Sequence, residues 1–416
     1  MKRNWIVVCI LLIVALIEAL ATGQSLFFNL TYLLTALLTV SYFWSWINIS
    51  NLHIVRQTRA TRSQVGQALE ERFLVHNRGL LPKLWVEVRD HSNLPGHRAS
   101  WVVTALGAHQ TRGWGVRTIC QQRGRFTLGP ITLISSDPFG LYEHHKHIPA
   151  TSSVVVYPLT VDLPYFILPS GELPGGGAMR RRTHYVTTDV SSIRDYFPGD
   201  SFNRIHWPST ARTERLMVKE FELDPTGDVW LFLDMQGAVH AERLIERETN
   251  ELPPLWPRRP TLLPSTEEYA VSIAASLAKH FLARNRAVGL IAYGQKREAL
   301  APDRGERQLT KIMETLAVIR AVGTIPLSQI LAAEGKGLGR NTSIIVITPS
   351  DDTNWVDNLR DLRRRGIHGM GIVLDASTFG RASNVHAVRA ALQQNDIPSY
   401  MVHEGDSLAA VLSIPA

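Results

Sequence analysis

Two long apolar runs open the chain, and only four residues separate them. Residues 5–21 and 26–47 are almost uninterrupted hydrophobic sequence. Each run is about as long as a helix must be to cross a hydrocarbon core of roughly 30 Å. A cleaved signal peptide is the other interpretation of the first run, but it is disfavoured because a second apolar run follows immediately. The pattern therefore predicts two transmembrane helices within residues 1–50.

Basic residues flank this helix pair on both sides and are absent from its turn. Lys2 and Arg3 precede the first run, and the second run is followed by Arg56, Arg59 and Arg62. Lys and Arg collect on the cytoplasmic side of membrane proteins. The distribution predicts a multi-pass protein of the inner or plasma membrane with both termini in the cytoplasm.

Beyond the apolar runs, residues 51–168 alternate apolar and polar positions over short distances. The alternating runs are 69–77, 84–90, 100–106, 113–120, 123–135 and 152–158. Several short strands at this spacing predict a small β-sandwich-like domain, which we interpret as a rigid spacer or an interaction module. Residues 169–193 contain runs of glycine and of arginine, and we interpret this stretch as a linker.

From residue 228 the period lengthens, and strands alternate with amphipathic helices. The predicted strands are 228–234, 287–293, 342–348, 369–375 and 397–403, and the predicted helices are 267–284, 306–320, 354–365 and 382–394. This alternation predicts a doubly wound α/β domain with a mostly parallel sheet covered on both faces. Ligands of such sheets bind beyond the carboxyl ends of the strands. A charged, proline-rich insertion at 240–264 is interpreted as a surface loop at that edge.

Residues 194–222, the signature motif, are unusually dense in aromatic, charged, proline and glycine residues. Those that stand out are Arg194, Tyr196, Pro198, Gly199, Asp200, Arg204, Trp207, Ala211, Arg212 and Lys219. Pro198-Gly199-Asp200 predicts a turn. Asp200 is the expected N-cap of a short helix that runs to Trp207 and is ended by Pro208. Residues 216–223 then predict a strand with one solvated face, so that 194–416 form the motif and the α/β domain.

The signature motif has two interpretations. Its arginines and Asp200 could pair with one another and join the linker to the α/β domain, because Arg–Asp pairs fix geometry. Alternatively, the motif is an exposed surface on which a partner protein docks. The two interpretations can coexist, and the sequence leaves both open.

The residue types and spacing of the signature motif resemble those of the domain-of-unknown-function 58 family of bacterial and archaeal membrane proteins. Two further stretches, Arg123-Gly124-Arg125-Phe126 and residues 137–141, resemble the same family. The resemblance implies a von Willebrand factor A-like C-terminal domain. It also implies a MoxR-type AAA+ ATPase as partner, often together with a transglutaminase-like membrane protein. The expected architecture is thus a membrane-anchored α+β multidomain protein.

In von Willebrand A domains a metal site uses Asp-x-Ser-x-Ser after the first strand. Here the equivalent stretch keeps Asp234 and offers Gln236, while Ala238 has no donor atom. Ser350 and Asp351 follow another predicted strand and can reach the same edge of the sheet. These oxygen ligands predict at most a weak Mg²⁺ site completed by water. In the alternative interpretation Asp234 only caps the backbone where its strand ends.

Composition and motif content narrow the function further. The net charge of +7 suits an anionic membrane surface, and no nucleic-acid-binding module accompanies it. No nucleophile elbow, metalloprotease motif or phosphate-binding loop occurs, so no catalytic residue and no resident cofactor are expected. The favoured hypothesis is a non-enzymatic, membrane-anchored adaptor that presents its α/β domain to the ATPase during assembly or remodelling of envelope-associated complexes. The alternative is a metal-dependent hydrolase or transferase at the membrane that uses Asp234 and Asp351.

Overall fold

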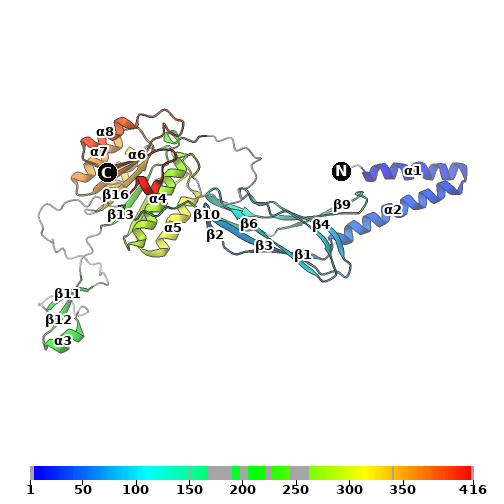
Figure 1. The fold of residues 1–416 in the computed structure, drawn as a ribbon, viewed down its shortest axis with the longest axis horizontal. Coiled ribbons are helices and arrows are strands. Elements are labelled where there is room, and N and C mark those ends of the chain that lie inside the picture. Colours follow the sequence, from blue (N-terminus) through cyan, green and yellow to red (C-terminus); the bar gives the residue numbers. More distant parts are fainter. Residues whose placement is uncertain are drawn as a thin grey trace. The chain divides into compact units, whose positions relative to one another are not determined.

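The computed structural model describes most of the chain as two compact units, one built mainly on residues 1–159 and the other mainly on 160–416 (Figure 1). The described residues are 4–149, 151–166, 168, 190–196, 205–221, 227–243, 262–339 and 342–413, with the backbone alone at 4, 190–194 and 219–221. Most of the predicted linker and of the 240–264 insertion therefore lies outside the described residues.

Two antiparallel helices begin the first unit. Helix α1 (Asn4–Thr22) and helix α2 (Ser25–Ile49) pack side by side, and the chain reverses at Gly23, whose φ of +67° is accessible to glycine. Small side chains such as Ala15 and Ala19 are buried, whereas most large apolar side chains point outward and are exposed. Both helices are long and apolar enough to cross a membrane. They confirm the two predicted helices with slightly wider bounds.

The β domain of the first unit contains ten strands in the described part of the chain. They are β1 (Leu52–Thr58), β2 (Arg62–Gln64), β3 (Ala68–Asn77), β4 (Lys83–Asp90), β5 (Trp101–Leu106), β6 (Thr111–Ile119), β7 (Gly124–Leu128), β8 (Ile131–Ser136), β9 (Glu143–Ile148) and β10 (Ser152–Tyr157). They form sheets of order β1-β3-β6, β5-β4-β8-β9 and β2-β10-β7. The first two sheets share one core that includes Phe73, Val86 and Leu133. Alternate residues of β1, β3 and β4 supply this core, as the sequence pattern predicted for 69–77 and 84–90.

The last turns of α2 are tied to the β domain by buried polar side chains. The Asn48 amide donates to the Trp85 carbonyl at 2.9 Å and to Ser135 Oγ at 2.6 Å, and its oxygen accepts from Leu84 N at 3.2 Å. Ser45 Oγ lies 2.8 Å from His144 Nδ1 and donates to the Ser135 carbonyl at 3.3 Å. Buried polar groups are costly unless they are paired. The junction is therefore stable only when helix and strands are correctly placed.

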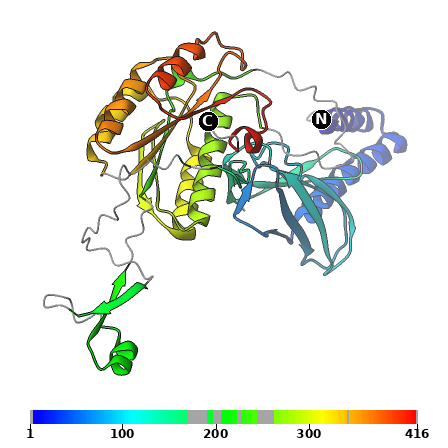
Figure 2. The same cartoon turned by 60° about the vertical axis from the view of Figure 1, so that its left-hand side comes forward.

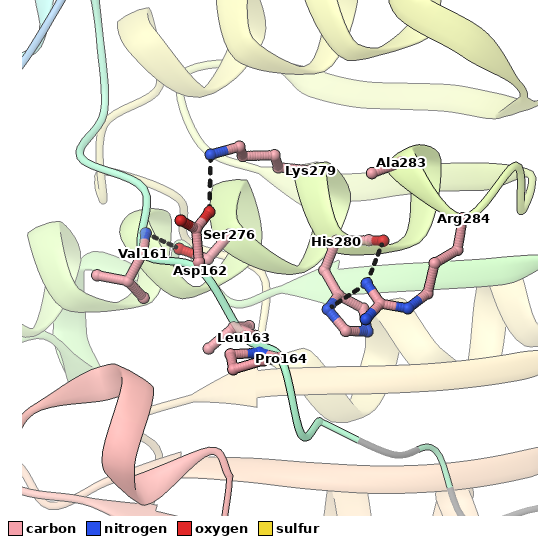
Figure 3. A pocket seen from close by; sticks show the side chains of 9 residues that line it. All are labelled: Val161, Asp162, Leu163, Pro164, Ser276, Lys279, His280, Ala283 and Arg284. Carbon is pink, nitrogen blue, oxygen red and sulfur yellow. Dashed lines mark hydrogen bonds and ion pairs between the residues drawn. The ribbon is translucent and has the colours of Figure 1, made fainter.

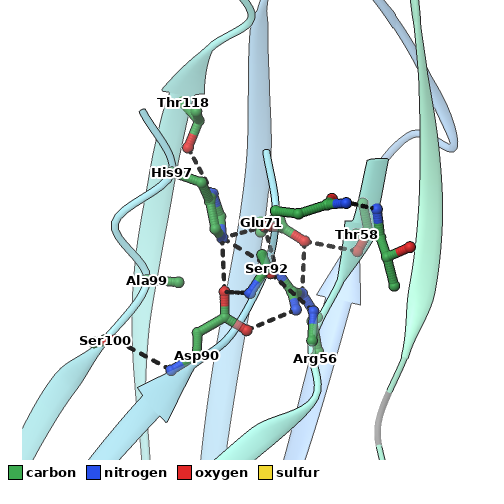
Figure 4. A network of polar contacts seen from close by, with 12 residues as sticks. Arg56, Thr58, Glu71, Asp90, Ser92, His97, Ala99, Ser100 and Thr118 are labelled. Carbon is green, nitrogen blue, oxygen red and sulfur yellow. Dashed lines mark hydrogen bonds and ion pairs between the residues drawn. The ribbon is translucent and has the colours of Figure 1, made fainter. Parts of the chain in front are cut away.

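A second polar cluster lies inside the β domain, and Figure 4 shows its members converging from four segments of the chain. Arg56 on β1 donates through Nε to Glu71 on β3 at 2.8 Å and through Nη1 to Asp90 on β4 at 3.0 Å. His97 Nε2 lies 3.2 Å from Glu71 and 3.3 Å from Asp90. All four side chains are almost completely buried. The cluster therefore fixes the pairing of these segments through charges that have no access to water.

The second unit is centred on a six-stranded sheet of order β15-β14-β13-β16-β17-β18. Its strands are β13 (Val229–Leu233), β14 (Val288–Tyr293), β15 (Arg297–Asp303), β16 (Ser343–Thr348), β17 (His368–Leu374) and β18 (Ser399–Val402). All neighbouring pairs are parallel except β14–β15. The predicted parallel sheet is confirmed, and the antiparallel edge strand β15 was not predicted. Numbered along the chain, the order is 3-2-1-4-5-6, which places a topological switch between β13 and β16.

Helices cover both faces of this sheet, as Figure 2 shows. The helical elements are α4 (Thr266–Ala283), α5 (Gly305–Val318), α6 (Leu327–Glu334), α7 (Asn354–Arg364), α8 (Val385–Gln394), α9 (Leu408–Val411) and the single turns η2 (Gly237–Val239) and η3 (Gly335–Gly337). Apolar residues of α6, α7 and α8 pack against the sheet in one core. Every residue of β16 is buried, as expected for a strand covered on both sides.

The boundary between the two units differs from the predicted one. We predicted that the β domain extends to residue 168, but the structure places Thr160 and the residues after it in the second unit. In this segment Val161 N donates to Ser276 Oγ at 3.0 Å, and Phe166 packs edge-on against His280 and Phe281. The alternation of residues 152–158 ends with β10, and the turn-rich sequence that follows gave no sign of where it would pack.

Replacing Arg56 by Met tests the buried cluster. The change leaves Glu71 and Asp90 buried without their cation, and we expect it to lower the local stability of β1 and β3 by about 3 kcal/mol. Hydrogen exchange of the amides in these strands, in the full chain, measures the effect. The matched control is Arg59→Met, because the Arg59–Glu70 ion pair is exposed and contributes little. Equal protection in wild type and Arg56→Met would contradict the assignment.

The same cluster predicts a pH dependence. Burial by itself raises the pKa of the Asp90 carboxyl, but hydrogen bonds from His97 and Ser92 and the charge of Arg56 outweigh it and lower that pKa below its ordinary value. The folded state therefore binds fewer protons at Asp90 than the unfolded state does. This contribution is complete above the unfolded pKa of about 4 and is lost as the pH falls through the folded pKa. Thermal unfolding of Asp90→Asn should depend less on pH in that acid range than wild type does.

Candidate functional site

The described part of the signature motif folds as a two-stranded ribbon with a short helix between its strands. Strands β11 (Val190–Asp195) and β12 (Met217–Phe221) pair antiparallel, and Tyr196 N donates to the Leu216 carbonyl at 2.8 Å. Ile205 forms an isolated bridge with Val218, and both side chains are buried. The strand predicted at 216–223 is confirmed as β12. The last four residues of the predicted linker belong to β11, which corrects that boundary.

Helix α3 (Trp207–Thr213) begins at the residue where the sequence predicted that a helix would end. Pro208 lies in its first turn, where a missing N–H costs nothing because no intrahelical acceptor is available there. His206 is the N-cap, and its Nδ1 accepts from Ser209 N at 3.3 Å. The prediction that Pro208 ends a helix is therefore wrong. The predicted cap Asp200 lies outside the described residues.

Helix α3 buries none of its residues. Trp207 is 65% exposed, and Ala211 and Arg212 are exposed on the same short helix. Within the described part of the chain, Arg212 forms no ion pair. Of the other motif residues, Tyr196 is half-buried. Arg194 and Lys219 are described by their backbone alone, and Pro198, Gly199, Asp200 and Arg204 lie outside the described residues.

The second candidate site lies at the carboxyl end of β13, at the switch point of the sheet. Asp234 is fully buried, and both of its carboxylate oxygens are occupied. Oδ1 accepts from Gln236 N at 3.0 Å, and Oδ2 accepts from Thr348 Oγ1, at the end of β16, at 2.6 Å. Burial raises the pKa of the Asp234 carboxyl, although these hydrogen bonds and the nearby His240 oppose the rise. The carboxylate thus joins two central strands.

Two residues that the sequence did not single out complete this arrangement. Thr348 also accepts from Ser350 N at 2.9 Å through the same oxygen that donates to Asp234. His240 Nε2 lies 2.9 Å from the Asp234 carbonyl, and its Nδ1 lies 3.0 Å from Thr266 Oγ1 at the start of α4. Thr348 is the last residue of an apolar strand, and only the pairing of β13 with β16 brings it to Asp234. His240 lay in the predicted surface loop, and the sequence gave no signal for it.

The predicted metal-site residues are only partly brought together. Ser350 is buried beside Thr348, while the Gln236 side chain is half-buried and contributes its backbone N–H to Asp234. The Asp351 side chain is exposed, and its carboxylate accepts from Asn384 N at 3.3 Å. Among the described residues, no group of three or more His, Cys, Asp or Glu side chains is arranged to hold a metal ion.

The loop after β13 is packed closely against two neighbouring loops. Gly323 N donates to the Met235 carbonyl and Gly237 N donates to the Gly323 carbonyl, both at 2.9 Å. A Cβ on Gly323 would lie 2.0 Å from the Tyr293 carbonyl oxygen and 2.9 Å from that of Met235. Only glycine fits at position 323. The loops that contain Met235, Tyr293 and Gly323 therefore pack directly against one another.

A shallow cavity of about 220 Å³ lies elsewhere in the second unit, as Figure 3 shows. It lies between residues 161–164 and the second half of α4, and Asp162 and Lys279 form an ion pair at its rim at 2.9 Å. Burial, together with the charge of Arg284, lowers the pKa of His280 on its wall. Typical small-molecule sites are larger, roughly 300–1,000 Å³. We assign no ligand to this cavity.

Replacing Asp234 by Asn tests the role of the buried carboxylate. Because its folded pKa is raised, the folded state binds more protons than the unfolded state, and stability falls as the pH rises from about 4 toward the folded pKa. Asn has similar shape and no charge. We expect Asp234→Asn to flatten this fall in thermal unfolding and to be at least as stable as wild type at pH 8. Asp351→Asn, an exposed carboxylate, is the control and should change little. A rise in melting temperature with Mg²⁺ that Asp234→Asn lacks would instead make Asp234 a metal ligand.

Comparison with known proteins gives one family match. Residues 192–248 match the family described as protein of unknown function DUF58, and this span runs from β11 past β13. The uncharacterised protein YeaD of Bacillus subtilis (strain 168) is 22% identical over 227 residues. The match covers 54% of this chain and 50% of YeaD, so the chain spans about half the length of this relative.

Two solved structures illustrate the likeness to parts of the chain. The CARDB domain of a Pyrococcus furiosus protein, solved with di-metal ions, has 18% identity and a TM-score of 0.20, and the match covers 25% of this chain and 91% of that domain. The pilus adhesin SpaC of Lactobacillus rhamnosus GG has 10% identity and a TM-score of 0.30 over 47% of this chain and 30% of its own. These low scores carry no argument. The motif match and the Bacillus relative agree with each other, and both support the assignment of the signature motif to the DUF58 family.

Proposed function

We propose that this protein is a non-enzymatic adaptor anchored in the membrane by α1 and α2. The basic residues on either side of the hairpin, Lys2 and Arg3 before it and Arg56 and Arg59 after it, support cytoplasmic termini in the inner or plasma membrane. In this arrangement the β domain and the α/β domain both stand on the cytoplasmic side. The helical hairpin holds the protein at the membrane, and the β domain and the α/β domain offer surfaces to which partners bind.

The exposed surface of α3 is the observation that carries this proposal. A Trp that is 65% exposed next to an exposed Arg is the pair of residue types most enriched at the energetic centres of protein interfaces. Exposed Trp and Arg side chains on one short helix within the signature motif suit a surface that a partner covers. We therefore favour the docking interpretation of the motif over the clasp.

A von Willebrand A-like identity of the α/β domain is part of the proposal. The position of Asp234 after the first strand of the sheet and of Thr348 at the end of a neighbouring strand supports it. In this domain the hydrogen-bonded Asp234 carboxylate would act as a structural remnant of a metal site, with at most weak Mg²⁺ binding. The hydrolase alternative is less well supported, because Asp234 and Asp351 make their described contacts with different parts of the chain.

The partner that we propose is a MoxR-type AAA+ ATPase, with a transglutaminase-like membrane protein as a further component. This part rests on the resemblance of the signature motif to its family. The adaptor would bring the ATPase to the membrane, where the ATPase remodels or assembles an envelope-associated complex. All ATP hydrolysis in this scheme belongs to the partner.

Co-purification from native membranes after mild cross-linking tests the adaptor proposal. We expect wild type to capture the ATPase and the Trp207→Ser, Arg212→Glu double variant to lose it, because the variant removes the proposed contact centre. The matched control is Trp101→Ser, Arg389→Glu, which changes an exposed Trp and an exposed Arg far from the motif in sequence. The control should capture as much ATPase as wild type.

Two results would count against the proposal in different ways. If the ATPase stays bound to a folded Trp207→Ser, Arg212→Glu variant, docking takes place elsewhere and the motif has a structural role. If no ATPase is captured by wild type, the inferred partner is wrong. Circular dichroism of each purified variant establishes that it is folded.

A further inference from the structure

Two loops at one end of the β domain present large apolar side chains to solvent. We refer to residues 78–82, between β3 and β4, and residues 137–141, between β8 and β9, as the tip loops. Leu80 is 83% exposed, Leu81 is 54% exposed and Phe139 is 61% exposed. Such side chains in adjacent loops need an apolar environment to be favourable.

Both tip loops lie beside the last turns of α2. Arg78 N, at the start of the first loop, donates to the Asn51 carbonyl at 2.9 Å, and the Lys83 ammonium group, just after that loop, donates to the Ile47 carbonyl. The second loop is followed by Tyr142, whose ring lies edge-on to Tyr42 of α2 with centroids 5.6 Å apart. The loops therefore flank the segment in which α2 passes into the β domain (Figure 1).

The length of the helical hairpin indicates how deep the last turns of α2 would lie in a bilayer. The chain turns at Gly23 and Gln24, so that Trp5 of α1 is roughly level with Tyr42 of α2. A helix needs about 20 residues at 1.5 Å each to cross a core of about 30 Å. Counted from the turn, the core ends within α2 near Tyr42 to Ser45. These are the residues that contact Tyr142 and Ser135, so the tip loops lie at the level of the lipid headgroups.

Buried polar side chains hold the apolar tips in place. The carboxylate of Asp137 accepts from Phe139 N at 2.9 Å, from Leu141 N at 2.8 Å and from Tyr142 N at 2.7 Å. In the first loop, Asn77 is fully buried, and its amide donates to the Leu81 carbonyl at 2.9 Å while its oxygen accepts from Gly79 N at 2.9 Å. These hydrogen bonds fix the backbone of both loops in a conformation in which the apolar side chains point outward.

We propose that the tip loops insert Leu80, Leu81 and Phe139 into the interfacial layer of the same bilayer that α1 and α2 cross. This inference rests on the membrane anchoring proposed above. The exposed Arg78 beside Leu80 favours anionic headgroups. The β domain then stands on the membrane with a fixed orientation, held by the helix junction and by two apolar contacts on either side of it. The occupant is lipid, because the loops continue the surface of a membrane-spanning helix.

Depth-dependent fluorescence quenching tests this proposal on the full chain in phosphatidylcholine–phosphatidylglycerol vesicles. Single cysteines replace Leu81 or Phe139 in a Cys9→Ala, Cys120→Ala background and carry an environment-sensitive label. We expect both labels to shift to shorter wavelength and to be quenched by lipids with a spin label near the headgroup. Trp101→Cys is the matched control: Trp101 is 56% exposed but pairs with Val88, toward the opposite end of β4 from Lys83. Its label should stay unquenched.

A third labelled position separates failure of this inference from failure of the anchor. Leu30→Cys on α2 should be quenched by lipids whose spin label lies deep in the acyl chain. If the Leu30 label is quenched and the two tip-loop labels behave like the Trp101 control, the loops do not enter the bilayer and the inference is overturned. If the Leu30 label is unquenched as well, the anchoring itself is wrong. If the tip-loop labels are shielded in detergent in a concentration-dependent way, a second copy covers them, and the lipid assignment is overturned.

Discussion

The first unit depends on the hydrogen bonds that pair the buried polar side chains at the end of α2 with the β domain. Ser45 and Asn48 lie in a mainly apolar helix and are shielded from water, so each unpaired group would cost roughly 1–3 kcal/mol. Their partners are on β4, β8 and β9, strands that are in register only when the β domain has folded. The end of α2 and the β domain consequently fold as one structural unit, and α2 is not a flexible linker to the β domain. This arrangement gives the tip loops a defined position relative to the last turns of α2.

Much of the architecture could be predicted because its signals are local. The helix predicted at 267–284 is α4 at Thr266–Ala283, and its periodic apolar face is contained within the segment itself. Strand β9 was not predicted, because its polar sequence has no alternation and its conformation comes from pairing with β8. The Arg56 cluster was also missed, because its members are dispersed over 41 positions of sequence and meet only through sheet pairing.

The candidate sites show a similar division. Asp234 could be singled out from its place after a buried strand, and the strand order explains why that place matters. Its partner Thr348 could not, because only the parallel pairing of β13 with β16 brings the two strand ends together. In the signature motif, Pro208 was interpreted as a helix terminator. The choice between ending and starting a helix depends on residues on both sides, and here the His206 cap decides it.

Only Ser50 and Asn51 separate α2 from β1. One residue added to the last turns of the helix would rotate everything before it by about 100° and displace it by about 1.5 Å. Ser45 and Asn48 would then lose their partners on the strands. We therefore expect α2 to tolerate an added residue near the Gly23 turn but not in its last turns, beside the β domain. The pairing register of the strands therefore fixes the position of the hairpin along its own axis. The number of residues between the last turns of α2 and the β domain is constrained by that register.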